Sequence, residues 1–172
     1  MKTLTLLRHA KSSWAEPGMK DFDRPLNKRG REAARLVGAD LKRRKISFDH
    51  ILASPAVRVR DTLEELENAY GSPLDISFDE QIYLASPKAL LSLVRALPET
   101  DASVLLVGHN PGMHEFALQL SKEDSDGLRG RITGKYPTGA LASIELPVDR
   151  WSDAGTKLGT ISALVLPREL AD

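Results

Sequence analysis

The feature that most constrains the fold is the apolar run that opens the chain, MKTLTLLRHA. Residues Thr3–Leu7 are apolar and partly β-branched and contain no Gly or Pro, so they predict a buried β-strand. The run stops at Arg8 and His9, a strong anion-binding group followed by an imidazole. Ligands of open α/β sheets bind just beyond the carboxyl ends of the strands. The position of Arg8 and His9 therefore predicts that they lie at a functional site.

Length and charge exclude several classes of protein. The 172 residues fit one domain, which we expect to span residues 1–172. Lys and Arg balance Asp and Glu at 24 each, so the overall charge favours neither nucleic acid nor a membrane as a partner. The absence of Cys excludes disulfides, thiolate metal sites and Cys nucleophiles. The N-terminal apolar run is too short for a signal sequence or a membrane span, and we expect a cytoplasmic protein.

The apolar pattern predicts alternating strands and helices. Beyond the first strand, strands are predicted over Phe48–Ala53, Ile76–Leu84, Ser103–Val107, Ala140–Leu146 and Thr160–Leu166, the last two as a hairpin-like pair. Helices are predicted after Asn27 as N-cap, after Ser54 as N-cap with Pro55 in the first turn, from Pro87 to Leu97 and from Met113 to Leu120. Lys11–Arg24 and Lys122–Lys135 are predicted loops, the second one mobile. This order predicts an α/β fold, with helices on both faces of a mainly parallel sheet.

Three predicted strands end in polar motifs, and we expect these motifs to converge if the strands are neighbours. They are Arg8-His9, Ser54-Pro55 leading to Arg58, and Gly108-His109-Asn110. Arginine offers a planar fork of donors that matches phosphate or carboxylate oxygens. Helix N-termini beyond two of these strands add backbone N–H donors. Together these groups predict a pocket for a dianion, with Arg8, Arg58, His109 and Asn110 as substrate-binding residues.

A histidine in such a pocket can act as a nucleophile toward phosphorus. Its attacking nitrogen must be unprotonated while the other nitrogen donates to a fixed acceptor. His9 is the better candidate because the strand that it ends fixes its position, and His109 then serves as a donor to the phosphoryl oxygens. A carboxylic acid is needed for the leaving group, and Glu80 is the first choice, with its neighbour Asp79 as the alternative. We expect no metal or other cofactor, because the arginines supply the charge stabilisation.

The stretches LLRHAKSSW, DFDRPLNKRGREAA, SPAVRVRDT and VLLVGHNPG carry a resemblance to a known family. In this order they resemble the histidine phosphatase superfamily, with its phosphoglycerate mutase-like fold, and within it the small SixA-type phosphohistidine phosphatases. The resemblance implies a three-layer α/β/α sandwich and transient phosphorylation of His9. It also implies that Arg8, Arg58 and His109 hold the phosphoryl group and that Glu80 donates the proton.

The sequence departs from the family pattern at Ala10, where the family's Arg-His-Gly reads Arg-His-Ala. The stretch from Ala69 to Ser86 leaves no room for a large cap domain, which predicts an open site suited to a phosphorylated protein, such as one bearing phosphohistidine. Two alternatives stay open. One is a broad phosphomonoesterase acting on small phosphorylated substrates, and the other is a phosphate-binding module without catalytic activity.

Overall fold

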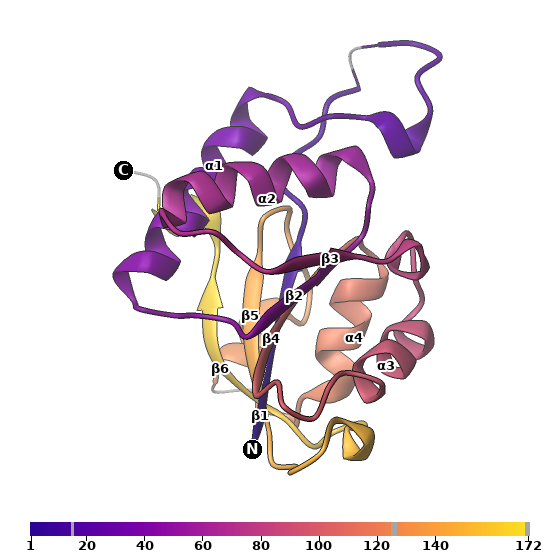
Figure 1. Cartoon of the computed structure of the whole chain (residues 1–172), viewed down its shortest axis with the longest axis vertical. Coiled ribbons are helices and arrows are strands. Elements are labelled where there is room, and N and C mark those ends of the chain that lie inside the picture. The colour runs from indigo at the N-terminus through magenta and orange to yellow at the C-terminus, as the bar shows by residue number, and fades with distance from the viewer. Residues whose placement is uncertain (15, 125–126, 171–172) are drawn as a thin grey trace.

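The computed structural model describes residues 1–14, 16–124 and 127–170, and its centre is a six-stranded sheet (Figure 1). The strand order is β3-β2-β4-β1-β5-β6. The strands are β1 (Lys2–Arg8), β2 (His50–Ala53), β3 (Ile76–Phe78), β4 (Ser103–Gly108), β5 (Leu141–Leu146) and β6 (Thr160–Val165). The pairs β3–β2, β2–β4 and β4–β1 are parallel, whereas β5 runs antiparallel to both β1 and β6. The predicted mainly parallel sheet and the C-terminal hairpin are confirmed.

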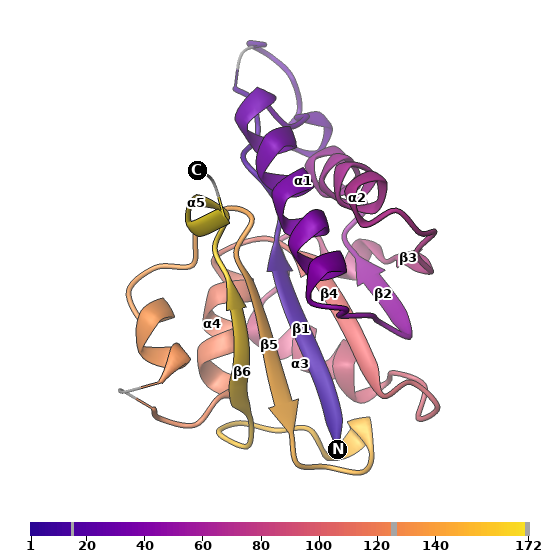
Figure 2. The same cartoon turned by 90° about the vertical axis from the view of Figure 1, so that its left-hand side faces the viewer.

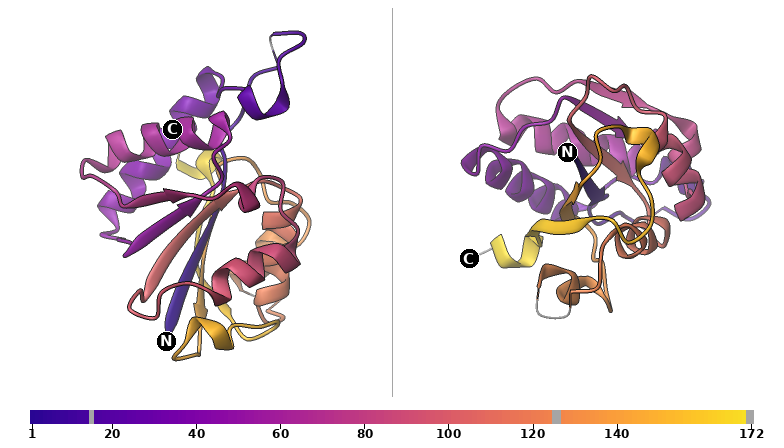
Figure 3. Two further views of the ribbon diagram at one scale, coloured as in Figure 1. Left: turned by 45° about the vertical axis from the view of Figure 1, so that its right-hand side comes forward. Right: turned by 90° about the horizontal axis from the view of Figure 1, so that it is seen from below.

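Helices cover both faces of the sheet (Figure 3). The helices α1 (Lys28–Arg43) and α2 (Val57–Tyr70) pack on one face, and α3 (Pro87–Arg95) and α4 (Gly112–Leu120) on the other, while the short α5 (Pro167–Leu170) follows β6. Alternation along β1 explains how one strand serves two cores: Leu4 and Leu6 pack with α3 and α4, and Leu7 packs with α1 and α2. The three-layer α/β/α sandwich is therefore confirmed.

The start of α1 is fixed against the chain that follows β1. Asn27 is the N-cap, as predicted, and its side chain accepts a hydrogen bond from the Gly30 amide at 2.8 Å. Only glycine fits at position 30, because a Cβ there would lie 2.1 Å from the Lys11 carbonyl oxygen. The backbone just beyond the catalytic candidates thus rests directly on the first turn of α1.

The predicted cap of α2 is wrong. The helix begins at Val57 with Ala56 as N-cap and no side-chain cap, so Pro55 precedes the helix and Arg58 lies in its first turn. Ser54 lies two residues before the N-cap, and its hydroxyl lies 2.8 Å from Nε2 of His109. The side chain that looked like a helix signal is a contact of the site instead.

Two predicted segments also differ in the structure. The extended run Ile76–Leu84 is a strand only over β3, after which the chain turns into the 3-10 helix η2 (Glu80–Ile82), capped by the side chain of Asp79. The predicted loop Lys122–Lys135 contains the 3-10 helix η3 (Leu128–Ile132), in which Ile132 is buried. Residues 125–126 of this loop lie outside the described residues.

The segment between β1 and α1 projects beyond the carboxyl end of the sheet (Figures 1 and 3). It includes the 3-10 helix η1 (Asp21–Asp23), and another 3-10 helix, η4 (Trp151–Asp153), lies between β5 and β6. No large cap is inserted between α2 and α3, where the chain forms only β3, η2 and their connections. None of the described helices is long and apolar enough to cross a membrane.

Candidate active site

The sheet brings the three predicted motifs together. β1 and β4 are parallel neighbours with Arg8 opposite Gly108, so His9 and His109 follow adjacent strand ends, with ring centroids 5.3 Å apart. β2 lies on the other side of β4, and the Ser54 amide donates to the Val107 carbonyl at 3.0 Å before the chain enters α2. Arg58, in the first turn of α2, is thereby carried to the same edge of the sheet.

The surroundings of His9 fix its tautomer. Its Nδ1 lies 2.7 Å from the carbonyl oxygen of Ala10, and because a carbonyl only accepts, Nδ1 carries the proton and donates it. Nε2 therefore keeps its lone pair. Burial, with Arg58 and Arg8 adding to it, lowers the pKa of His9 to about 4. His9 is thus a neutral imidazole with a free Nε2 at neutral pH, which is the form that a nucleophile requires.

His109 is set up as a donor rather than a second nucleophile. The Oγ atom of Ser54 is buried and accepts from the Ala56 amide at 3.3 Å, and among the described residues its own proton has no acceptor other than Nε2 of His109, which lies 2.8 Å away. The proton of the neutral ring then lies on Nδ1, which is buried and has no partner among the described residues. Burial and the neighbouring His9 and Arg58 lower the pKa of His109 to about 3. Nδ1–H is available to an acceptor within the pocket.

Each of the two arginines, Arg8 and Arg58, also has one N–H donor that is not used within the described residues. Arg58 donates through Nη1 to the Asp21 carbonyl at 2.8 Å and through Nη2 to the Asp21 carboxylate at 3.1 Å, and Arg8 donates through Nη1 to the Tyr136 carbonyl at 3.1 Å. Within the described chain, the Nε of each arginine is buried and has no acceptor. A buried donor without a partner costs about 1–3 kcal/mol, more when charged. Burial and the nearby Arg58 lower the pKa of Arg8. An oxyanion would relieve both effects.

Three side chains at this edge were not predicted from the sequence. Asp21 accepts from the hydroxyl of Tyr83 as well as from Arg58, and these hydrogen bonds, the Tyr83 bond first, lower the pKa of Asp21. The ring of Tyr83 packs edge-on against His109, with centroids 5.3 Å apart. Arg24 is 7% exposed, and its charge contributes to the low pKa of His9. Asp21 and Arg24 belong to the stretch DFDRPLN, which is part of the family resemblance, but no periodic pattern in this stretch indicates where their side chains point.

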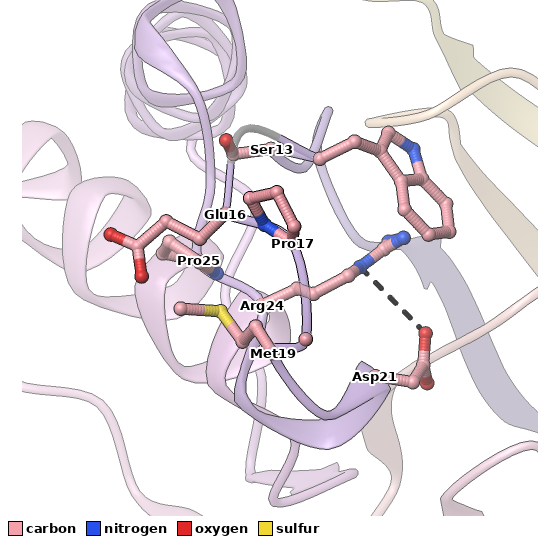
Figure 4. A pocket seen from close by; sticks show the side chains of 9 residues that line it. Ser13, Glu16, Pro17, Met19, Asp21, Arg24 and Pro25 are labelled. Carbon is pink, nitrogen blue, oxygen red and sulfur yellow. Dashed lines mark ion pairs between the residues drawn. The ribbon is translucent and has the colours of Figure 1, made fainter.

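The guanidinium of Arg24 is held between an aromatic ring and a carboxylate (Figure 4). Its Cζ lies 3.4 Å from the centroid of the Trp14 ring, and its Nε lies 3.7 Å from the Asp21 carboxylate. Nη2 donates to the Ser12 hydroxyl at 2.5 Å, which links the two ends of the segment between β1 and α1. A cavity of about 400 Å³ opens beside this cluster, with Pro17 and Met19 in its wall.

The structure does not bring the other predicted residues into the same contacts. Glu80 is exposed on η2, and its side chain makes no hydrogen bond or ion pair within residues 1–14, 16–124 and 127–170. The side chain of Asp79 accepts from the Gln81 amide at 2.8 Å. Asn110 donates to the Tyr136 carbonyl at 2.9 Å and accepts from the His114 amide at 3.2 Å, so its amide already has partners on both sides.

Backbone hydrogen bonds also hold the residues at the carboxyl end of β1 in place. The Ala10 amide donates to the Thr62 hydroxyl at 3.0 Å, and that hydroxyl donates to the Arg58 carbonyl at 2.7 Å. The Gly139 amide lies 3.0 Å from the carbonyl oxygens of both Arg8 and His9. Across the described residues, no group of three or more His, Cys, Asp or Glu side chains is arranged to hold a metal ion. The site is thus a largely buried cluster of two histidines and two arginines at the carboxyl edge of an α/β sheet.

Comparison with known proteins agrees with this class of site. The sequence profile of the histidine phosphatase superfamily (branch 1) matches residues 4–82. A crystal structure assigned as phosphohistidine phosphatase SixA from Agrobacterium tumefaciens is 32% identical and superposes with a TM-score of 0.82, over 96% of this chain and 98% of that one. Phosphohistidine phosphatase SixA of Escherichia coli (strain K12) is 28% identical over 143 residues, covering 82% of this chain and 83% of the relative.

A SixA protein histidine phosphatase in complex with tungstate has the same fold, with a TM-score of 0.79 at 23% identity over 98% of this chain and 99% of that one. The chain belongs to the histidine phosphatase superfamily, in its SixA-type branch. This membership supports phosphatase activity on a phosphorylated substrate.

Proposed function

We propose that residues 1–172 form one catalytic domain, a metal-independent phosphatase of the cytoplasm that removes phosphate from phosphohistidine on a signalling protein. The observation that carries the proposal is the state of His9. Its Nδ1 is protonated against the Ala10 carbonyl and its Nε2 is unprotonated, beside buried guanidinium donors of Arg8 and Arg58 that have no partner in the described chain. A module that only binds phosphate has no need of a nucleophile held in this form.

The reaction proceeds in two steps. Nε2 of His9 attacks the phosphorus, the bond between phosphorus and the leaving atom breaks, and a proton goes to the leaving atom. Water then attacks the phosphoryl group on His9, loses a proton, and releases inorganic phosphate and the free imidazole. The N–H donors of Arg8, Arg58 and His109 stabilise the charge on the equatorial oxygens in both steps. Glu80, or Asp79 beside it, is proposed as the acid for the first step.

The kind of substrate follows from the leaving group and from the shape of the molecule. A protonated imidazole leaves more readily than an alkoxide and depends less on a strong acid, which fits the absence of Glu80 from the hydrogen-bonded cluster. No large cap encloses the edge of the sheet between α2 and α3, which suits a phosphoryl group displayed on a protein. SixA relatives named phosphohistidine phosphatases support the same substrate class.

The test compares two substrates in the presence of a chelator. We expect the purified chain to hydrolyse a phosphohistidine peptide at a far higher kcat/KM than glycerol 2-phosphate, a phosphoester whose leaving group is an alkoxide. The change Glu80→Gln should slow the phosphoester much more than the phosphohistidine peptide. Faster hydrolysis of the phosphoester would instead support the broad small-molecule phosphomonoesterase. Tight phosphate binding without turnover of either substrate would support the non-catalytic module.

A further inference from the structure

A second concave surface lies next to the candidate active site. It is a groove of about 380 Å³ between the first half of α1 and the segments that precede β5 and follow β6. Figure 2 shows α5 beside α1, at the same end of the sheet at which β1 and β6 terminate. Its apolar lining includes Ala33 and Leu36 of α1 and Leu166 at the end of β6. We call this surface the α1–α5 groove.

Most of the cations that line the α1–α5 groove are unpaired among the described residues. The cationic side chains in its lining are Lys11, Arg29, Arg131, Lys135 and Arg168, against the single carboxylate of Glu32. Arg131 pairs with Glu169 just outside the groove. Within the part of the chain that the structure describes, the side chains of the other four cations make no hydrogen bond or ion pair. The chain as a whole carries equal numbers of cations and anions, so this imbalance is local.

Two residues that line the α1–α5 groove, Lys11 and Thr138, lie next to the site along the backbone. Lys11 lies two residues after His9, and its carbonyl accepts from the Asn27 amide at 3.0 Å at the start of α1. On the opposite wall, Thr138 is followed by Gly139, whose amide lies 3.0 Å from the carbonyl oxygens of Arg8 and His9. Both walls of the groove therefore adjoin the residues that flank His9.

We propose that the α1–α5 groove binds an acidic segment of the phosphorylated protein, beside its phosphohistidine. This inference rests on the proposed function and adds the feature by which the enzyme would recognise its phosphorylated protein. The four unpaired cations attract carboxylates and repel basic segments, and such complementarity raises the association rate and selects partners. The apolar floor of Ala33, Leu36 and Leu166 suits the aliphatic parts of a polypeptide, which favours a protein segment over nucleic acid.

The test uses two phosphohistidine peptides of equal length. One carries Asp and Glu in the segment flanking the phosphohistidine, and in the other these residues are Asn and Gln. At low salt we expect a kcat/KM for the acidic peptide about fivefold or more above that for the neutral one. Raising the salt concentration should shrink the difference, because exposed charges are screened within about 10 Å at 0.1 M. Equal kcat/KM values for the two peptides at low salt would overturn the proposal.

Charge-reversal variants test whether the preference for the acidic peptide arises in the α1–α5 groove. The double variant Arg29→Glu, Arg168→Glu should lose the preference for the acidic peptide while hydrolysing the neutral peptide within about twofold of the unmodified chain. Both substitutions place Glu in the first turn of a helix, where a carboxylate is well tolerated. The matched control is Lys45→Glu, Lys88→Glu, with the same charge change outside the groove, and it should keep the preference. Loss of the preference in the control alone, or in both variants, would contradict the assignment to the groove.

A binding measurement separates this inference from the proposed function. If the unmodified chain hydrolyses neither peptide, the proposed function fails, and fluorescence anisotropy with the labelled, unphosphorylated acidic peptide still tests the groove. We expect this peptide to bind, and the variant Arg29→Glu, Arg168→Glu to weaken the binding about tenfold. Unchanged binding by this variant would overturn the proposal, as would tighter binding of a single-stranded RNA of equal charge.

Discussion

Ser54 links the carboxyl end of β2 to the imidazole of His109. Its hydroxyl accepts from the Ala56 amide and donates to Nε2 of His109, which leaves the imidazole proton on Nδ1. We expect Ser54→Ala to lower kcat about 10- to 100-fold with a smaller change in KM, because the donor to the phosphoryl oxygens loses its fixed tautomer. Ser54→Thr should restore much of kcat, since it retains the hydroxyl. Steady-state kinetics of the two variants on a phosphohistidine peptide checks this, and equal losses in both would contradict it.

Asp21 occupies donors that an oxyanion would otherwise use. Both Nη atoms of Arg58 donate to Asp21, one to its carbonyl and one to its carboxylate, and the carboxylate also faces Arg24. We expect Asp21→Asn to tighten inhibition by inorganic phosphate about three- to tenfold, because a competing negative charge is removed from the pocket. The inhibition constant of phosphate, measured at pH 7, tests this. Weaker inhibition would mean that Asp21 mainly positions Arg58.

At the scale of elements, the packing of α1 on α2 depends on a glycine. A Cβ at Gly38 would lie 2.3 Å from the Leu66 carbonyl oxygen, so the two helices approach too closely for any side chain. Helix propensity alone predicts that Gly→Ala stabilises a helix by about 1 kcal/mol. We expect the opposite for Gly38→Ala, a loss of about 2 kcal/mol or more, because the helices must move apart. Urea unfolding of the Gly38→Ala variant and of the unmodified chain measures this difference in the free energy of unfolding.

The control for this prediction is Gly134→Ala. A Cβ at Gly134 meets no atom within 4 Å, so its free energy of unfolding should change by less than about 0.5 kcal/mol. A Gly38→Ala variant as stable as this control would show that α1 can shift without cost.

The elements that a periodic pattern specifies could be predicted from the sequence. Leu6 and Leu7 of β1 face opposite cores, as expected from the alternating order of strands and helices, which predicts a sheet covered on both faces. Because parallel strands end at one edge, the convergence of Arg8, His9 and His109 followed as well. The contacts of Asp21 and of Arg24 could not be predicted, since an irregular segment has no period that fixes where its side chains point.

At the scale of the whole molecule, the two buried histidines make folding sensitive to acid. The pKa of His9 is lowered to about 4 and that of His109 to about 3, from an ordinary value of 6.5. The unfolded chain therefore binds more protons below pH 6.5, and the free energy of unfolding falls as the pH drops toward these folded-state values. Each histidine contributes on the order of 3 kcal/mol that is present above pH 6.5 and lost on acidification.

Urea unfolding between pH 7 and pH 4 tests this dependence. The double variant His9→Asn, His109→Asn should lose much of the slope, because Asn does not titrate. A variant with the same slope as the unmodified chain would mean that other groups, such as the Asp21 carboxylate, dominate acid unfolding.

In the proposed mechanism, Nε2 of His9 carries the phosphoryl group from the substrate to water. The most direct measurement is to mix the chain with a phosphohistidine peptide in the presence of a chelator, quench within milliseconds in alkali, which preserves phosphohistidine, and locate the phosphate by mass spectrometry. We predict phosphate on His9 in the unmodified chain and none in His9→Ala. Phosphate on another residue, or turnover by His9→Ala at an undiminished rate, would contradict the mechanism.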